Sequence, residues 1–415
     1  MDFNNFKYQF KTKSHFLAIS GLVLMLGSQT ALSSEIKIEA GTVDAYRDEP
    51  VLRGPSVLND DERFVWGGSV IKGDDGKYHM FYSTWESGED IPKFSDSWVL
   101  YSKIAYAVSD YPDRDFKTQK IFLPGSADAG NPDAWDAQFT HNPHIQKFDG
   151  KYYLYYVGSK DPGVQPPGSS AVNVNKRNRV QQLQKIGVIA FDSFDQLLDG
   201  TFERPTEPIL VPRTRVKADD IVAPSPCGTE PLPDNIIVTN PSVVRRPSDG
   251  KYLLYFKGNI YDPEWKGVHG VAIGDTPTGP FTPLDQFVFK ILNEDGTFAS
   301  AEDPYVWYHP KHEKFYAVIK DFTGKFTEGK PGLAILESKD GLEWTKPAEP
   351  FFMKKEITLK TGEVIPMDRL ERPQILIDED GNPQVLYAAG AINNVNIRQD
   401  GSSFNIQIPL KTIAD

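Results

Sequence analysis

One pattern occurs five times along the chain: a polar entry, an apolar run of strand-like residues, a short turn, which contains glycine in four of the copies, and a second run rich in Tyr, Phe, Leu and Val. The alternation within these runs is typical of half-buried antiparallel strands. Four copies open with an X-Pro step: Asn142-Pro143, Asn240-Pro241, Asp303-Pro304 and Arg372-Pro373. In the first copy Gly67-Gly68-Ser69 stands at this place. A strand pair that recurs in register predicts a repeat architecture.

Further strand-like elements follow four of the five pairs. Third strands are expected at 104–110, 186–190, 270–275 and 333–338, and short fourth strands around Phe122, Leu210, Phe289 and Phe352. Four strands per unit, with units roughly seventy residues apart, predict an all-β, five-bladed β-propeller with four-stranded antiparallel blades. Five such blades use nearly all of residues 34–415, which we expect to form a single domain with little helix.

The first 33 residues read as a signal peptide rather than as part of the fold. Lys7, Lys11 and Lys13 precede an apolar run at 17–27, and the small residues around Ser33 mark an expected cleavage site. The apolar run is too short to span a bilayer. The sequence therefore predicts a periplasmic or secreted protein that does not insert into the membrane after the signal is removed.

Charge and cysteine content exclude several classes. Removing 1–33 takes away three Lys and one Asp, which leaves 42 basic and 56 acidic residues and a formal net charge of −14. Nucleic acid is therefore not an expected partner, since phosphate binding needs a basic face. Cys227 is the single cysteine, so no intrachain disulfide can form, and its Pro-rich surroundings do not suggest a nucleophile. No phosphate-binding glycine loop or dinucleotide fingerprint is present.

The repeat places a set of polar residues at one end of the propeller. Residues that enter each first strand should ring a central pocket, and residues that end each second strand should join them. The expected ring is Gly67/Gly68, His141/Asn142, Thr239/Asn240, Glu302/Asp303 and Glu371/Arg372, and the expected second layer includes Trp85, Glu86, Lys257, Lys320 and Asp321. Carboxylates, amides and cations suit sugar hydroxyls, and Trp66, Trp85 or Trp265 could stack on the C–H face of a sugar ring.

The chain resembles the five-bladed propeller glycosidases of glycoside hydrolase families 43, 32, 68 and 117. The resemblance covers about residues 60 to 395 and is carried by the Asn/Asp-Pro entries, the run Gly150–Tyr156, and the segment Gly270–Phe281 with its Pro-Thr-Gly-Pro-Phe turn. It implies two essential carboxylates, a base and an acid, with a third acidic residue that tunes the acid. Mapped onto this chain, the catalytic candidates are Glu302, Asp303 and Glu371. The candidates for substrate binding are Trp66, Trp85, Glu86, His141, Asn142, Asn240, Lys257, Lys320, Asp321 and Arg372.

The chain departs from this pattern where the resemblance places the general base. In family 43 that base is an Asp at the first strand entry, and here Gly67-Gly68-Ser69 occupies the place. Glu86, Asp61 or Asp136 could supply it, or the chain could be a divergent member, for which family 117 enzymes acting on anhydrogalactose-containing algal sugars are the comparison. Since neighbours on a strand point to opposite faces, we do not expect Glu302 and Asp303 both to reach the substrate.

Other clusters carry weaker predictions. His141, His144 and Asp136 are expected to line the pocket or to be structural rather than to bind a metal, and His269 is expected to pack within its strand. The basic cluster Arg213, Arg215 and Lys217 could meet a sulfated or uronic sugar or form a solvated loop. Two long excursions, 161–184 and 212–235, could be functional or disordered. No cofactor or metal is predicted, although an ion such as calcium in the central channel stays open.

The leading hypothesis is an exported, exo-acting glycoside hydrolase that removes a terminal sugar from a polysaccharide-derived oligosaccharide, with algal anhydro- or sulfated galactans among its candidate substrates. One alternative is a glycoside phosphorylase, for which Lys257, Lys320 and Arg372 could supply the cations. The other is a non-catalytic sugar-binding propeller, suggested by the absence of an Asp at the first entry.

Overall fold

The computed structural model describes residues 36–49, 51–86, 94–169, 171–213, 231–261, 265–327, 329–392 and 401–413, all within one compact unit, Glu35–Asp415. The proposed signal peptide, Arg215, Lys217, Cys227 and the side chain of Trp265 lie outside the described residues. Within the described ranges, no helix has the length and apolar character needed to cross a membrane.

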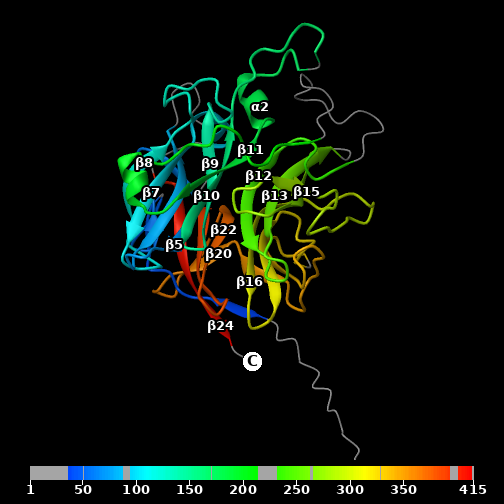
Figure 1. Cartoon of the computed structure of the whole chain (residues 1–415). Helices are drawn as coiled ribbons and strands as arrows, with labels where there is room; N and C mark the ends of the chain where they lie inside the picture. The colour runs from blue at the N-terminus through cyan, green and yellow to red at the C-terminus, as the bar shows by residue number, and fades with distance from the viewer. Residues whose placement is uncertain are drawn as a thin grey trace, which may run out of the picture. The chain divides into compact units, whose positions relative to one another are not determined.

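Five antiparallel sheets form the blades of a propeller (Figure 1). Blade 1 contains β5 (Phe64–Lys72), β6 (Tyr78–Trp85), β7 (Lys103–Ser109) and β8 (Lys117–Leu123), and blade 2 contains β9 (Phe139–Phe148), β10 (Lys151–Ser159) and β11 (Lys185–Phe191). Blade 3 contains β12 (Val238–Arg245), β13 (Tyr252–Tyr261), β14 (Trp265–Gly274) and β15 (Phe281–Pro283). Blade 4 contains β16 (Ala301–His309), β17 (Lys314–Asp321), β18 (Gly332–Ser338) and β19 (Phe351–Lys354). Blade 5 contains β22 (Arg369–Ile377), β23 (Pro383–Ala391), β24 (Ser403–Ile413) and β1 (Lys37–Ala40). The predicted fold class is confirmed.

Smaller elements decorate the blades. The hairpins β2–β3 (Tyr46–Asp48, Val51–Arg53) and β20–β21 (Glu356–Thr358, Val364–Pro366) stand apart from the five sheets, and β4 (Val57–Leu58) pairs with β24. The described helices are short, as expected: α1 (Phe94–Tyr101), α2 (Lys176–Gln181) and α3 (Asp195–Asp199).

The ring is closed by the fifth blade, which joins strands from both ends of the described chain. β1 pairs antiparallel with β24 from Lys37↔Ile413 to Ala40↔Leu410, and so supplies the fourth strand of the last blade (Figure 1). The repeat did not predict this pairing, because β1 lies outside the five copies. Its backbone hydrogen bonds link the first and last parts of the propeller.

Two predicted fourth strands are wrong. In blade 2, Leu210 makes a single bridge to Ile186, and in blade 3 the strand lies at β15 while Val288, beside Phe289, makes a single bridge to His269. After β11 the chain turns into α3, and Phe194 and Leu197 are buried in an apolar cluster with Phe81. This burial takes the place of a fourth strand.

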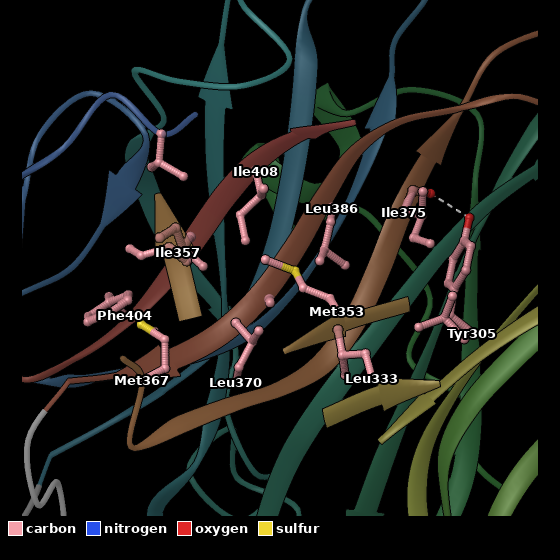
Figure 2. Packing of buried hydrophobic residues seen from close by; sticks show 14 of the residues in the cluster. Tyr305, Leu333, Met353, Ile357, Met367, Leu370, Ile375, Leu386, Phe404 and Ile408 are labelled. Carbon is pink, nitrogen blue, oxygen red and sulfur yellow. Dashed lines mark hydrogen bonds between the residues drawn. The ribbon is translucent and has the colours of Figure 1, made fainter. Parts of the chain in front are cut away.

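Apolar side chains from neighbouring blades interlock to form the core. Figure 2 shows the cluster between blades 4 and 5, to which Leu333 of β18, Leu386 of β23 and Phe404 of β24 all belong. Tyr305 donates a hydrogen bond from its hydroxyl to the carbonyl oxygen of Ile375 at 2.5 Å, which ties blade 4 to blade 5. Each such buried side chain stabilises the fold by about 1.5–3 kcal/mol, so the blade interfaces hold the entry strands in fixed positions.

Every first strand carries the same irregularity at its entry. In blade 4 the pairing passes from Glu302↔Lys320 directly to Tyr305↔Val318, and matching shifts occur in the other blades. The residues before the four prolines have positive φ: Asn142 (49°), Asn240 (54°), Asp303 (60°) and Arg372 (52°). This left-handed conformation is uncommon outside glycine and re-aims the side chain next to a bulge.

The bulges correct two expectations. In blade 1 the irregular step falls on Trp66 and Gly67, between the pairs Val65↔Thr84 and Gly68↔Tyr82, so Trp66 and not Gly67 or Gly68 stands at the entry position. Glu302 and Asp303 both line the same pocket, because the bulge breaks the alternation of a regular strand.

Candidate active site

A pocket of about 490 Å³ opens where the five entries meet. The catalytic candidates Glu302, Asp303 and Glu371 all line it. So do most of the predicted binding residues: Trp66, Trp85, His141, Asn142, Asn240, Lys257 and Arg372. Lys320 contacts two of the pocket carboxylates from the neighbouring strand. The register of the repeat was therefore sufficient to bring together side chains that lie far apart in the sequence.

Glu302 and Glu371 share a cation. The Nζ atom of Lys320 lies 2.5 Å from Oε1 of Glu371 and 4.0 Å from Oε2 of Glu302, so these two oxygens are at most 6.5 Å apart, the sum of the two distances. Glu302 also pairs with Lys257 at 2.5 Å, and Glu371 with Arg369 at 3.3 Å. The side chains of Glu302 and Glu371 are 26% and 14% exposed, which leaves both accessible from the pocket.

The cations keep Glu302 charged. Burial acts to raise the pKa of Glu302, but the charges of Lys257 and Lys320 and a hydrogen bond from Lys257 outweigh it, and the pKa is lowered from its ordinary value. Glu302 is therefore suited to accept a proton, or to act as a nucleophile, rather than to donate one at neutral pH.

Asp303 is placed deeper and has different partners. Its Oδ1 accepts a hydrogen bond from Nδ2 of Asn240 at 2.6 Å, and its Oδ2 accepts one from the backbone N–H of Arg372 at 3.0 Å. Burial raises the pKa of Asp303 to about 6, against the opposing charge of Arg372. Because both oxygens already accept hydrogen bonds, this carboxylate is arranged to hold Asn240 and Arg372 in position.

A chain of amides continues from Asp303 around the ring. Asn240 uses its Oδ1 to accept from Nδ2 of Asn142 at 2.6 Å and from the Thr239 hydroxyl at 3.0 Å. The backbone N–H of Asn142 in turn donates to Ser83 of blade 1 at 2.8 Å. When ionised, the carboxylate of Asp303 only accepts, and it therefore sets the orientation of the Asn240 and Asn142 side-chain amides.

Arg372 forms the floor of the pocket and is 2% exposed. Its side chain packs against the backbone of Gly67, where an added Cβ would lie 2.9 Å from Cβ of Arg372. Its Nη1 is 3.7 Å from Asp303, and its Nη2 donates to the carbonyl of Asn142 at 3.5 Å. Arg372 thus starts in blade 5 and reaches blades 1, 2 and 4. Glycine in blade 1 is required for this close approach.

An aromatic wall stands beside the carboxylates. Trp98 of α1 lines the pocket and stacks on His141, with ring centroids 4.6 Å apart. His141 is also hydrogen-bonded to Ser102 at 2.7 Å, and burial lowers its pKa well below the ordinary value, so it is neutral. Trp85 is buried and donates to Ser97 at 2.9 Å. Trp98 was missed in the sequence because it lies on a helix between strands, outside the repeat.

The first long excursion supplies another wall. Gln181, Gln184 and Asn178, in and beside α2, line the pocket. Arg177 fixes α2 to α1 by donating to the carbonyl of Ser95 at 2.9 Å. The first excursion is therefore part of the site, and it contributes side-chain amides rather than basic groups to the pocket lining.

One arginine of each excursion forms ion pairs within the fold. Arg179 pairs with Asp161 at 2.8 Å in the first excursion, and Arg213 of the second pairs with Asp234 at 2.7 Å and with Asp285 at 2.8 Å. The expected sugar contact of Arg213 is not supported, since its guanidinium already serves two carboxylates.

Four acidic candidates lie outside the pocket lining. Glu86 is 60% exposed and pairs with Arg63. Asp321 accepts hydrogen bonds from the backbone N–H groups of residues 323, 324 and 326 and so shapes the loop after β17. Asp61 pairs with Arg53 at 2.6 Å, and the buried Asp136 pairs with Arg204 at 2.9 Å. The places predicted for Glu86 and Asp321 are corrected, and none of the three alternative bases enters the pocket lining.

No cluster of three or more His, Cys, Asp or Glu side chains that could hold a metal ion occurs in the described part of the chain. His144 is hydrogen-bonded to Gln374 at 2.8 Å and to the backbone N–H of Val243 at 3.0 Å. His269 is buried beneath Phe289, and burial lowers its pKa to about 3. Both histidines have structural surroundings.

Comparison with solved structures places this fold among glycosidases. Zg3597, a family 117 glycoside hydrolase from the marine bacterium Zobellia galactanivorans, matches at 17% identity and a TM-score of 0.51, over 91% of each chain. BT0996, solved as an RGII complex, matches at 12% identity and a TM-score of 0.54, over 87% of this chain and 91% of that one. A thermostable family 43 glycoside hydrolase matches at 11% identity and 0.51, over 86% and 92%. No protein-family model and no curated protein sequence matches. The resemblance predicted from sequence is confirmed at the level of the fold.

Proposed function

We propose that this protein is an exported, exo-acting glycoside hydrolase that removes a terminal sugar from a polysaccharide-derived oligosaccharide. The observation that carries the proposal is the pair Glu302 and Glu371, from neighbouring blades, facing one pocket on either side of Lys320. Hydrolysis of a glycosidic bond needs two carboxyl groups with different protonation. The likeness to glycoside hydrolase propellers supports the fold on which this chemistry would take place.

Each residue has a distinct role in this proposal. Glu302, kept charged by two lysines, acts as the base or nucleophile. Glu371, which pairs with Lys320 and Arg369, is assigned the protonation of the leaving oxygen because it is the other carboxyl group of the pair. Asp303 is a positioning residue that holds Asn240 and Arg372, and Trp98 provides a stacking face for the sugar ring. An Arg372 floor and walls from α1 and α2 favour a chain end over the middle of a polysaccharide.

The separation of the two carboxylates frames the stereochemistry. Inverting glycosidases hold the pair about 6.5–9.5 Å apart and retaining ones about 5–5.5 Å apart. Glu302 Oε2 and Glu371 Oε1 are at most 6.5 Å apart. This limit is compatible with the separation in retaining enzymes and reaches only the shortest separation found in inverting enzymes. The anomer first released, followed by NMR, decides between them, and retention would argue against a family 43 type of mechanism.

The test is a screen of the protein without residues 1–33 on oligosaccharides from agar, carrageenan and arabinoxylan, with analysis of every product. We expect release of one terminal monosaccharide by the parent and by Glu86→Gln, a matched carboxylate outside the pocket, and none by Glu371→Gln. Release of internal fragments would refute the exo mode. Retained sugar binding with no turnover by the parent would favour a non-catalytic binding protein, the alternative suggested by the absence of an Asp at the first entry, where Trp66 stands.

A further inference from the structure

The pocket contains more cations than carboxylates. Among the described residues that line it or pair with its lining, the cations are Lys257, Lys320, Arg369 and Arg372, and the carboxylates are Glu302, Asp303 and Glu371. His141 is neutral. The pocket therefore has a surplus of one positive charge, whereas the whole chain has a formal net charge of −12.

The pairing of these groups shows where the surplus lies. Lys257 and Lys320 each contact a glutamate at 2.5 Å, so their charges are matched. Asp303 directs its hydrogen bonds to Asn240 and to a backbone N–H, and its oxygen is 3.7 Å from Nη1 of Arg372, too far for a hydrogen bond. The guanidinium of Arg372 is therefore the poorly satisfied group of the site.

Arg372 has donors to spare. Its Nε and Nη1 are buried and donate to no described residue, and its Nη2 makes one long hydrogen bond of 3.5 Å. A buried donor without an acceptor is costly, more so when it is charged. Beside it, the buried Oδ1 of Asn142 accepts from no described residue. The floor thus contains a guanidinium with two buried, unpartnered donors beside one buried, unpartnered acceptor.

We propose that the terminal sugar carries an oxyanion, as a uronic acid carboxylate or a sulfate ester, which binds the guanidinium of Arg372 while a neighbouring hydroxyl donates to Asn142. Planar guanidinium groups bind such oxyanions through two parallel hydrogen bonds, a geometry that lysine does not reproduce. Arg369, 29% exposed and 3.3 Å from Glu371, adds a second positive charge at the wall. This inference rests on the proposed function for its sugar, but its test measures binding rather than hydrolysis.

The test is a fluorescence titration of the pocket tryptophans with galactose, galacturonate, galactose 6-sulfate and inorganic phosphate. We expect at least one of the two charged sugars to bind about tenfold or more tightly than galactose, and this preference to weaken with added salt. A tighter galacturonate complex assigns a carboxylate and a tighter galactose 6-sulfate complex assigns a sulfate ester. Both results support the inference.

Two variants locate the effect. Arg372→Gln should abolish the preference for the charged sugar, and Arg372→Lys, which keeps the charge without the fork, should retain only part of it. Thermal unfolding first establishes that each variant is folded. If Arg372→Gln does not fold, Arg369→Gln at the partly exposed wall provides the measurement, with an expected loss of about threefold in preference.

Several results would overturn the inference. Equal affinity for galactose and for the charged sugars refutes it, as does a preference that survives both the Arg372 and the Arg369 substitutions. Tighter binding of inorganic phosphate than of any sugar would refute it and favour phosphorolysis. Hydrolysis of neutral sugars alone would refute the inference and leave the proposed function intact. Binding of a charged sugar without any turnover would support the inference and refute the proposed hydrolase function.

Discussion

Replacing Lys320 with Met removes the cation that Glu302 and Glu371 share. Lys320 lies 4.0 Å from Glu302, and at an effective dielectric constant of about 20 two unit charges at that distance interact by about 4 kcal/mol, or about three pKa units. Lys257 stays 2.5 Å from Glu302, and the Glu302 side chain is 26% exposed, so water and the remaining lysine offset part of the loss. We therefore expect the pKa of Glu302 to rise by about one to two units.

The sign of the effect on activity follows from the role of Glu302. The lysines lower the pKa of this carboxyl, so the loss of Lys320 raises it, and the ionised form becomes scarce at a higher pH than in the parent. The acid limb of the kcat/KM profile should move to higher pH by about one to two units. Lys320→Arg, which keeps the charge, is the matched control and should leave that limb near its parental position.

Unfolding gives a second readout that needs no substrate. A carboxyl whose pKa is lowered in the folded state contributes stability above its unfolded pKa of 4.5 and loses it as pH falls through the folded value. Urea unfolding between pH 3 and 7 should therefore show a shallower rise of stability with pH in Lys320→Met than in the parent. An acid limb that stays in place in Lys320→Met, or moves equally in Lys320→Arg, would refute the reasoning.

Three further predictions concern the surroundings of the carboxylates. Asp303→Asn should lower the free energy of unfolding by about 3 kcal/mol, because either orientation of the new amide turns a donor toward the Asn240 amide or toward the Arg372 N–H. Urea unfolding measures this change, and a decrease below about 1 kcal/mol would contradict the prediction. Trp98→Ala should raise KM about tenfold or more with a smaller effect on kcat, as expected for a lost stacking face, and steady-state kinetics with an unchanged KM would count against that role. Removing residues 34–40 takes away β1 and leaves an edge of β24 unpaired; the melting temperature should fall by several degrees, and an unchanged value would show that ring closure does not depend on β1.

The sequence predicted the positions of residues that belong to the repeat, but not the contacts made by residues outside it. Four X-Pro steps in register were enough to predict the blades and to bring Glu302, Glu371 and Arg372 to one pocket. The sequence did not predict that the side chains of Glu302 and Asp303 both point into the pocket. Their orientation depends on the positive φ of Asp303, which the hydrophobic pattern does not reveal. The first entry was assigned to Gly67 and Gly68 rather than to Trp66, because Trp66 takes the equivalent place without a following proline to mark it.

Contacts made by insertions had no repeat to guide them. Trp98 on α1 and Gln181 on α2 line the pocket from segments that occur once in the chain. The ion pairs of Arg213 and of Glu86 depend on partners brought close only by folding, so neither role could be read from local sequence. Residues that belong to the repeat were predicted well, whereas the walls of the pocket needed the structure.

The most direct measurement of the central claim is the turnover of one hydrolysed oligosaccharide by the parent, Glu302→Gln and Glu371→Gln, each first shown to be folded and to bind the sugar. If these two carboxylates perform the chemistry, both variants should lose about a thousandfold or more in kcat while binding persists. Turnover within about tenfold of the parent in either variant would contradict the assignment of that residue, and in both would place the catalytic site elsewhere.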